Sequence, residues 1–138
     1  MRKIFILSII LTFISCEGFI RTNDPVESYK YWAGDEPPKE INLINGEYLQ
    51  TPHFTLEYQL FLQFKSNGDW FNEFIKYNNL KIDTINNDWK SGLELPKWFN
   101  PSKDFIKYSR NQHDEFDRSR YFVNPKNGMC YIFETFGM

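Results

Sequence analysis

Apolar and polar residues alternate along residues 54–65, which read FTLEYQLFLQFK. Every even position of this stretch is apolar, and every odd position except Phe61 is polar. A period of two residues is typical of a β-strand with one buried face, because successive side chains in a strand point to opposite sides. The pattern predicts a strand in an antiparallel sheet that is covered on one side.

A helix is predicted directly after this strand, over residues 68–79. Ser66 is a suitable N-cap, and Asp69 stands three residues later in the capping-box position. Apolar side chains then follow at helical spacing along one side of the segment: Trp70, Phe71, Phe74 and Ile75. We expect this amphipathic helix to cover the apolar face of the strand.

Two further strands are predicted near the C-terminal end, over residues 120–123 and 129–133. They flank the sequence NPKNG, in which Pro125 suits a type I turn and Gly128 supplies the positive φ that closes a hairpin. Together these elements predict an α+β fold. In it, a small antiparallel sheet with a C-terminal hairpin packs against one main amphipathic helix.

The first 16 residues have the organisation of an export signal. Two basic residues precede an apolar stretch from Ile4 to Ser15, which is too short to span the hydrocarbon core of a bilayer as a helix. The segment FISC, residues 13–16, resembles the lipobox of bacterial lipoprotein signal peptides. The resemblance implies that Cys16 carries a diacylglycerol and becomes the first residue of the mature protein. The alternative is an ordinary signal or an uncleaved anchor in which Cys16 is incidental.

This resemblance implies a membrane-anchored protein of the bacterial cell envelope that faces the periplasm or the cell surface. The chain then divides into a signal peptide (1–15), a lipidated N-terminus with a flexible tether (16–40) and a single α+β domain (41–138). Prolines and charges favour the tether. Within the tether, Tyr31 and Trp32 are candidate binding residues. Three roles are open for these two residues: packing on the domain, contact with lipid headgroups, and binding of a partner.

Charge, cysteine content and the motifs present limit which partners, disulfides and cofactors are expected. The chain has 16 Lys and Arg against 18 Asp and Glu, without a basic cluster, which argues against nucleic-acid binding. With Cys16 acylated, Cys130 is the only other cysteine, so no disulfide is expected. No phosphate-binding loop or other cofactor motif occurs in the sequence, so no cofactor is expected.

Two groups of residues offer candidate chemistry. The first is a histidine with three carboxylates, which could ligate a metal ion or form a solvated acidic loop: His113, Asp114, Glu115 and Asp117. The second is Trp98 with Phe99, which could form an aromatic platform for a glycan or complete the core. Cys130, in the middle of a predicted strand, is expected to be a buried, inert thiol.

The sequence favours a non-catalytic envelope lipoprotein that binds another protein, for example an immunity protein that neutralises a toxin. Immunity proteins are often small, acidic and lipid-tethered, so this version rests on analogy. One alternative is a module that binds a glycan, peptidoglycan or a small ligand. The other is a hydrolase or metal site around His113.

Overall fold

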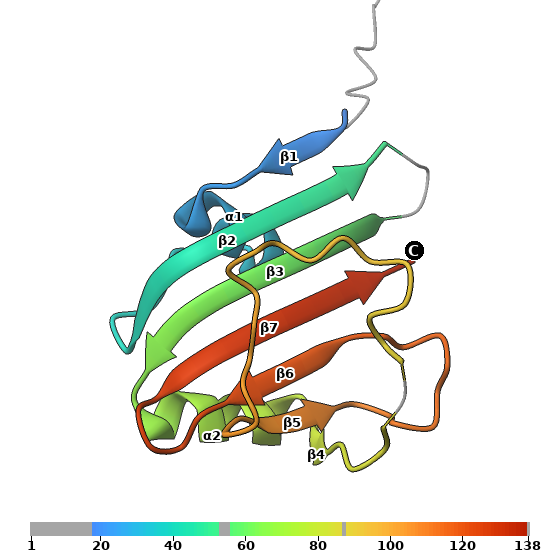
Figure 1. Cartoon of the computed structure of the whole chain (residues 1–138). Coiled ribbons are helices and arrows are strands. Elements are labelled where there is room, and N and C mark those ends of the chain that lie inside the picture. The colour runs from blue at the N-terminus through green and yellow to red at the C-terminus, as the bar shows by residue number, and fades with distance from the viewer. Residues whose placement is uncertain (1–17, 53–55, 87, 138) are drawn as a thin grey trace, which may run out of the picture.

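The structure is a computed structural model, and it describes residues 18–52, 56–86 and 88–137. This part of the chain forms a seven-stranded sheet and two short helices (Figure 1). The strands have the order β1-β2-β3-β7-β6-β5-β4, and every neighbouring pair is antiparallel. The elements are β1 (Ile20–Thr22), α1 (Pro25–Ala33), β2 (Ile41–Thr51), β3 (Glu57–Ser66), α2 (Gly68–Tyr77), β4 (Lys81–Ile82), β5 (Ile106–Ser109), β6 (Arg120–Val123) and β7 (Met129–Phe136).

The predicted fold class, a small sheet against one main amphipathic helix, is therefore wrong. The sheet is the dominant element, and the helices are only 9 and 10 residues long. The main reason is β2, whose sequence INLINGEYLQT does not alternate. A register shift between Leu43 and Asn45 interrupts its pairing with β3, and such a bulge moves the following side chains to the other face.

Residues 20–33, which we expected in the flexible tether, form β1 and α1 instead. Pro25 begins α1 rather than interrupting it, because the first helical position needs no N–H donor. The Asp24 side chain caps the helix by accepting the backbone N–H of Glu27 over 2.8 Å. In β1, Ile20 pairs with Gln50 of β2, so the chain joins the sheet two residues after Gly18.

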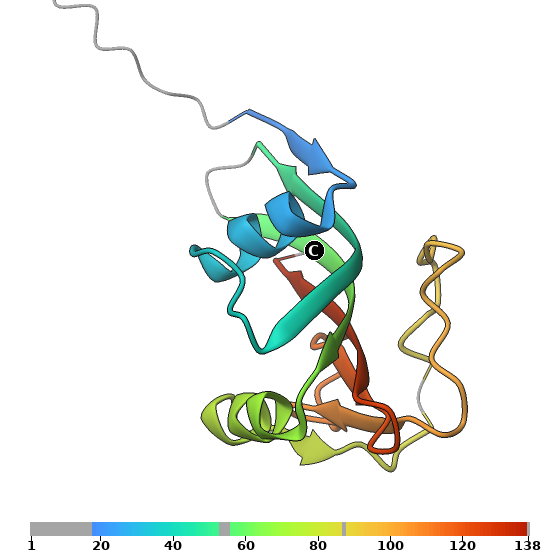
Figure 2. The ribbon, with the colours of Figure 1, turned by 90° about the vertical axis from the view of Figure 1, so that its left-hand side faces the viewer.

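Both helices cover one face of the sheet (Figure 2). The even side chains of β3, including Leu60, Leu62 and Phe64, are buried on this face as the alternation predicts. Tyr29 of α1 and Phe71 of α2 are buried in the same cluster. The N-cap of α2 is Asn67, whose side chain accepts the N–H of Trp70 over 3.1 Å, and not Ser66, which is the last residue of β3.

The opposite face of the sheet is covered by the irregular segment 83–105 between β4 and β5 (Figure 2). Trp89 and Phe99 of this segment pack on Phe61, Phe122 and Phe133 of three strands. The ring centroids of Phe61 and Phe99 lie 5.1 Å apart. This second core explains why Phe61 is apolar among polar odd positions, and it makes the sheet buried on two sides instead of one.

A buried ion pair joins the start of segment 83–105 to the sheet. The Nε atom of Arg120 on β6 lies 2.8 Å from Oδ2 of Asp83, and both side chains are almost inaccessible to solvent. The Arg120 guanidinium also donates to the backbone oxygens of Asp117 and Ser119, over 2.9 and 2.7 Å. Lys107 approaches the same Asp83 carboxylate to 3.5 Å. The covering segment is therefore held at its first residue by charge as well as by its aromatic rings.

Candidate functional site

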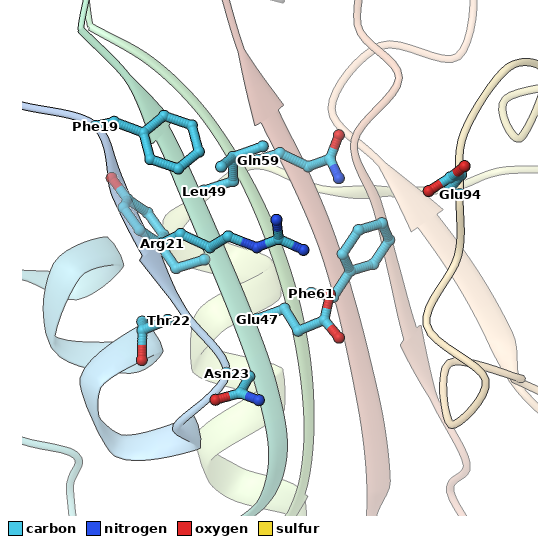
Figure 3. A pocket seen from close by; sticks show the side chains of 10 residues that line it. Phe19, Arg21, Thr22, Asn23, Glu47, Leu49, Gln59, Phe61 and Glu94 are labelled. Carbon is cyan, nitrogen blue, oxygen red and sulfur yellow. The ribbon is translucent and has the colours of Figure 1, made fainter.

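A groove of about 570 Å³ lies over β1, β2 and β3, on the face opposite the helices (Figure 3). Strand register builds its floor: Arg21 of β1 pairs with Leu49 of β2, which pairs with Gln59 of β3. In a neighbouring row, Glu47 of β2 pairs with Phe61 of β3. Glu94 of segment 83–105 forms the facing wall. The groove thus combines three strands and one distant segment of the chain.

The groove exists because segment 83–105 covers only part of this face. Its aromatic rings pack over β3, β6 and β7, whereas β1 and β2 lie beyond them in the strand order. Figure 2 shows the segment standing on the opposite side of the sheet from α1 and α2. The row that contains Arg21 and Leu49 therefore stays accessible.

The lining of the groove mixes charge with apolar surface. The Arg21 guanidinium extends across the groove in the direction of Glu47 and Phe61 (Figure 3). The described lining contains one cation and two carboxylates, those of Glu47 and Glu94. Phe19 adds an aromatic ring that is 58% exposed. Such a lining suits the binding of a partner that carries both a positive charge and an apolar side chain.

A second polar centre lies on the helix-covered face, around Glu134 of β7. This side chain is 8% exposed. Its carboxylate accepts hydrogen bonds from Nε1 of Trp32 over 2.9 Å, from the hydroxyl of Tyr121 over 2.6 Å and from the hydroxyl of Tyr58. Burial, and then the nearby carboxylate, raise the pKa of both tyrosines, so the two hydroxyls stay protonated donors at neutral pH. This centre ties α1, β3, β6 and β7 together through one shared, buried acceptor.

Sequence reasoning missed both the groove and the Glu134 centre. The signal for Glu134 is a single carboxylate within the strand sequence YIFETF, where the neighbouring positions are mostly apolar. A charged residue there needs partners when the strand is buried. The groove carries no comparable local signal, because it depends on the pairing of β1 with β2.

The tether aromatics dock on the domain. Trp32 is half-buried and donates to Glu134. Tyr31 is 50% exposed, and its ring stacks on Tyr48 of β2 with centroids 5.3 Å apart. Of these two candidate binding residues, Tyr31 alone keeps half of its surface for another molecule.

The proposed glycan platform lies largely in the second core. Phe99 is only 3% exposed and is surrounded by Phe61, Tyr131 and Trp89. Trp98 is half-buried beside it, with ring centroids 6.0 Å apart. Phe99 therefore presents no ring face to a sugar.

The acidic loop before β6 is organised by local hydrogen bonds. His113 and Glu115 are exposed. Asp114 accepts the N–H of Phe116 over 2.9 Å, and Asp117 pairs with Nε of Arg110 over 3.2 Å. Within residues 18–52, 56–86 and 88–137, no three His, Cys, Asp or Glu side chains converge on a point where they could hold a metal ion.

Of the two cysteines, the structure describes Cys130 alone. Cys130 is buried, and burial raises the pKa of its thiol to about 12, although the hydrogen bond with the Ser66 hydroxyl opposes this shift. Such a thiol is protonated and unreactive at neutral pH. Cys16 lies outside the described residues, so its acylation stays a prediction.

Among the helices of the described chain, none has the length and apolarity needed to span a bilayer. No protein-family model, curated protein or solved structure matches this chain at a significant level.

Proposed function

We propose that the chain is a membrane-anchored, non-catalytic lipoprotein of the cell envelope that binds another protein in the groove over β1, β2 and β3. The observation that supports this function is the groove itself, where Arg21, Glu47 and Glu94 surround apolar side chains on an accessible sheet face. Protein interfaces combine an apolar centre with polar and charged surroundings in this way. The lipid anchor is implied by the FISC segment at residues 13–16.

The partner is a protein that presents a basic, partly apolar segment. Two carboxylates against one guanidinium give the described lining a negative balance, and the whole chain has a formal net charge of −2. Because β1 is an outer strand of the sheet, an extended segment can lie along it while its side chains enter the groove. An immunity protein that neutralises a basic toxin is the sharpest form of this proposal.

The test starts from the full-length, processed protein, immobilised in detergent and exposed to an envelope and secreted-protein extract of the host and its close neighbours. We expect one protein to be retained in stoichiometric amount at low salt and released at high salt. The retained protein is then purified and titrated calorimetrically against wild type, the double variant Glu47→Lys/Glu94→Lys and the control Glu40→Lys/Glu73→Lys.

The control carries the same charge change at two exposed residues outside the groove. We expect the groove variant to lose about tenfold or more in affinity, equivalent to at least ~1.4 kcal/mol, and the control to keep most of it. Equal weakening by both variants would show that net charge, not the groove, governs binding. A column that retains no protein would contradict the protein-binding function.

A second candidate function, small-ligand or glycan binding, is favoured by the size of the groove. Its volume of about 570 Å³ falls within the range of roughly 300–1,000 Å³ that is usual for ligand pockets. Titration of soluble peptidoglycan fragments into wild type and Arg21→Ala tests this function, because Arg21 is exposed and lines the groove. Saturable binding that is lost in the variant, while the unfolding transition of the variant stays cooperative, would support it.

A further inference from the structure

We infer that the end of the sheet at which the chain enters β1 lies against the lipid bilayer in the anchored protein, with Phe19, Leu56 and Phe136 as contact side chains. This inference deepens the proposed function and rests on its lipid anchor at Cys16. It adds an orientation and a lipid-contacting surface, neither of which the anchor alone implies.

The link between Cys16 and the sheet is short. A tether over residues 16–40 would reach on the order of 80 Å when extended, at ~3.3–3.6 Å per residue. The structure shortens it, because Ile20 is already paired with Gln50. Consecutive Cα atoms are 3.8 Å apart, so the Cα atoms of Cys16 and Ile20 can be separated by at most about 15 Å in any conformation. An acylated Cys16 therefore keeps this end of the sheet at the membrane surface.

The strand register brings the three side chains to the same end of the sheet. Ile20, Gln50, Tyr58 and Phe136 form one row across β1, β2, β3 and β7. Phe19 directly precedes this row and Leu56 lies two residues before Tyr58. Figure 1 shows the start of β1, the start of β3 and the end of β7 at one end of the sheet.

All three side chains are exposed to solvent. Phe19, Leu56 and Phe136 are 58, 51 and 55% exposed, although each belongs to or adjoins a strand of the sheet. Burial of such side chains is favourable, and aromatic rings are enriched where a protein meets the membrane interface. Glu57, the carboxylate between Leu56 and Tyr58, accepts a hydrogen bond from the Thr51 hydroxyl over 3.1 Å, which offsets part of the desolvation that membrane contact requires.

Other exposed apolar side chains provide the contrast. Ile44 is 41% exposed near the opposite end of β2, where Ile41 pairs with Ser66. Tyr77 is 91% exposed on α2, which begins after the other end of β3. Neither residue lies near the link to Cys16, so both serve as matched positions that the inference places in water.

The test uses the full-length, lipidated protein in vesicles of phosphatidylethanolamine and phosphatidylglycerol. Single cysteines at Leu56→Cys or Phe136→Cys, and at the controls Ile44→Cys or Tyr77→Cys, are labelled with an environment-sensitive fluorophore. The buried Cys130 thiol is left in place. We expect probes at 56 and 136 to emit at shorter wavelength in the vesicle-bound protein than in protein that has been released from its lipid anchor into detergent-free buffer. Nitroxide-labelled lipids should quench the emission of these two probes. Probes at 44 and 77 should show neither change.

Three outcomes overturn the inference, and they are distinguishable. Protein that does not co-sediment with the vesicles, with Cys16 unacylated by mass spectrometry, contradicts the anchor and the inference together. Protein that co-sediments with unquenched probes at 56 and 136 contradicts the inference alone. Self-quenching at 56 and 136 that grows with protein density, without quenching by lipid nitroxides, assigns this end to a second copy of the chain instead of the bilayer.

Discussion

Nε1 of Trp32 donates a hydrogen bond to Oε1 of Glu134 over 2.9 Å, joining residues that are 102 positions apart in sequence. The same carboxylate accepts from Tyr121 and Tyr58. A helix that begins five residues after the start of β1 is thus attached to the middle of the sheet by a shared buried acceptor. Cooperative polar networks of this kind favour one packing arrangement over others.

The Glu134 centre should be a major source of stability. We expect Glu134→Gln to lower the free energy of unfolding by about 2–3 kcal/mol. The carboxylate has two oxygens that accept from three donors, whereas the amide has one oxygen to accept from the same three donors. Urea denaturation followed by tryptophan fluorescence measures this change. Glu73→Gln, on the exposed side of α2, is the control. A loss below about 0.5 kcal/mol in Glu134→Gln would be the size of an ordinary surface substitution and would contradict the assigned role.

The ion pair between Arg120 and Asp83 should behave as a unit. We expect Asp83→Asn to cost about 3–5 kcal/mol, because it leaves the buried Arg120 guanidinium without its carboxylate. The double variant Asp83→Leu/Arg120→Met should recover much of this loss, since removing both charges also removes their desolvation cost. Thermal unfolding of the single variants Asp83→Leu and Arg120→Met and of the double variant gives the coupling energy. Additive losses would show that the two side chains act independently.

Gly46 permits the close approach of α1 to β2. A Cβ atom at this position would lie 2.8 Å from Cα of Pro25 and 3.1 Å from Cδ2 of Leu62. We expect Gly46→Ala to destabilise the protein by about 1–3 kcal/mol, because a backbone contact must shift. Gly68→Ala is the control, since a Cβ there meets nothing within 4 Å. Equal stability of the two variants in urea would show that α1 has room to move away from β2.

Cys130 should respond to pH through its buried thiol. Its pKa rises from 9.0 to about 12 on folding, so above pH 9 the unfolded chain loses a proton that the folded chain keeps. This contribution to stability is therefore complete below about pH 9 and is lost as the pH rises to about 12, at ~1.4 kcal/mol per pH unit for one proton. Cys130→Ser should remove this slope from the pH dependence of the free energy of unfolding, which is measured by urea denaturation between pH 9 and pH 12.

The same thiol should resist alkylation while the protein is folded. We expect no reaction of Cys130 with iodoacetamide at pH 8 and complete reaction in urea, as read by mass spectrometry, because the side chain is buried and protonated. Rapid alkylation of the native protein would contradict the buried, inert assignment.

The elements that local sequence pattern predicts are those whose signals are also local. Residues 57–66 alternate because one strand face packs on helices, and α2 follows at once with its aromatic residues at helical spacing. The hairpin of β6 and β7 has Gly128 in the left-handed conformation, with φ 75°, as its turn sequence indicates. In each case neighbours in the chain are also neighbours in space.

The remaining elements depend on distant partners. In β2, the bulge before Asn45 and the small Gly46 serve contacts with β3 and α1, so the sequence shows neither regular alternation nor strong β-propensity. The helix α1 begins at a proline, which also fits a tether. The groove requires both the pairing of Arg21 with Leu49 and the position of Glu94, and no window of the sequence contains these residues together.

The place of β7 sets the order in which this sheet can be completed. It lies between β3 and β6, yet it follows every other described strand along the chain. As the polypeptide emerges N-terminal end first during synthesis, β1, β2 and β3 can pair early, while the inner edge of β3 waits for Met129 to Phe136. Such a long-range closure slows folding and leaves an adhesive strand edge exposed. A chaperone that shields β3 during synthesis would therefore matter most before β7 arrives.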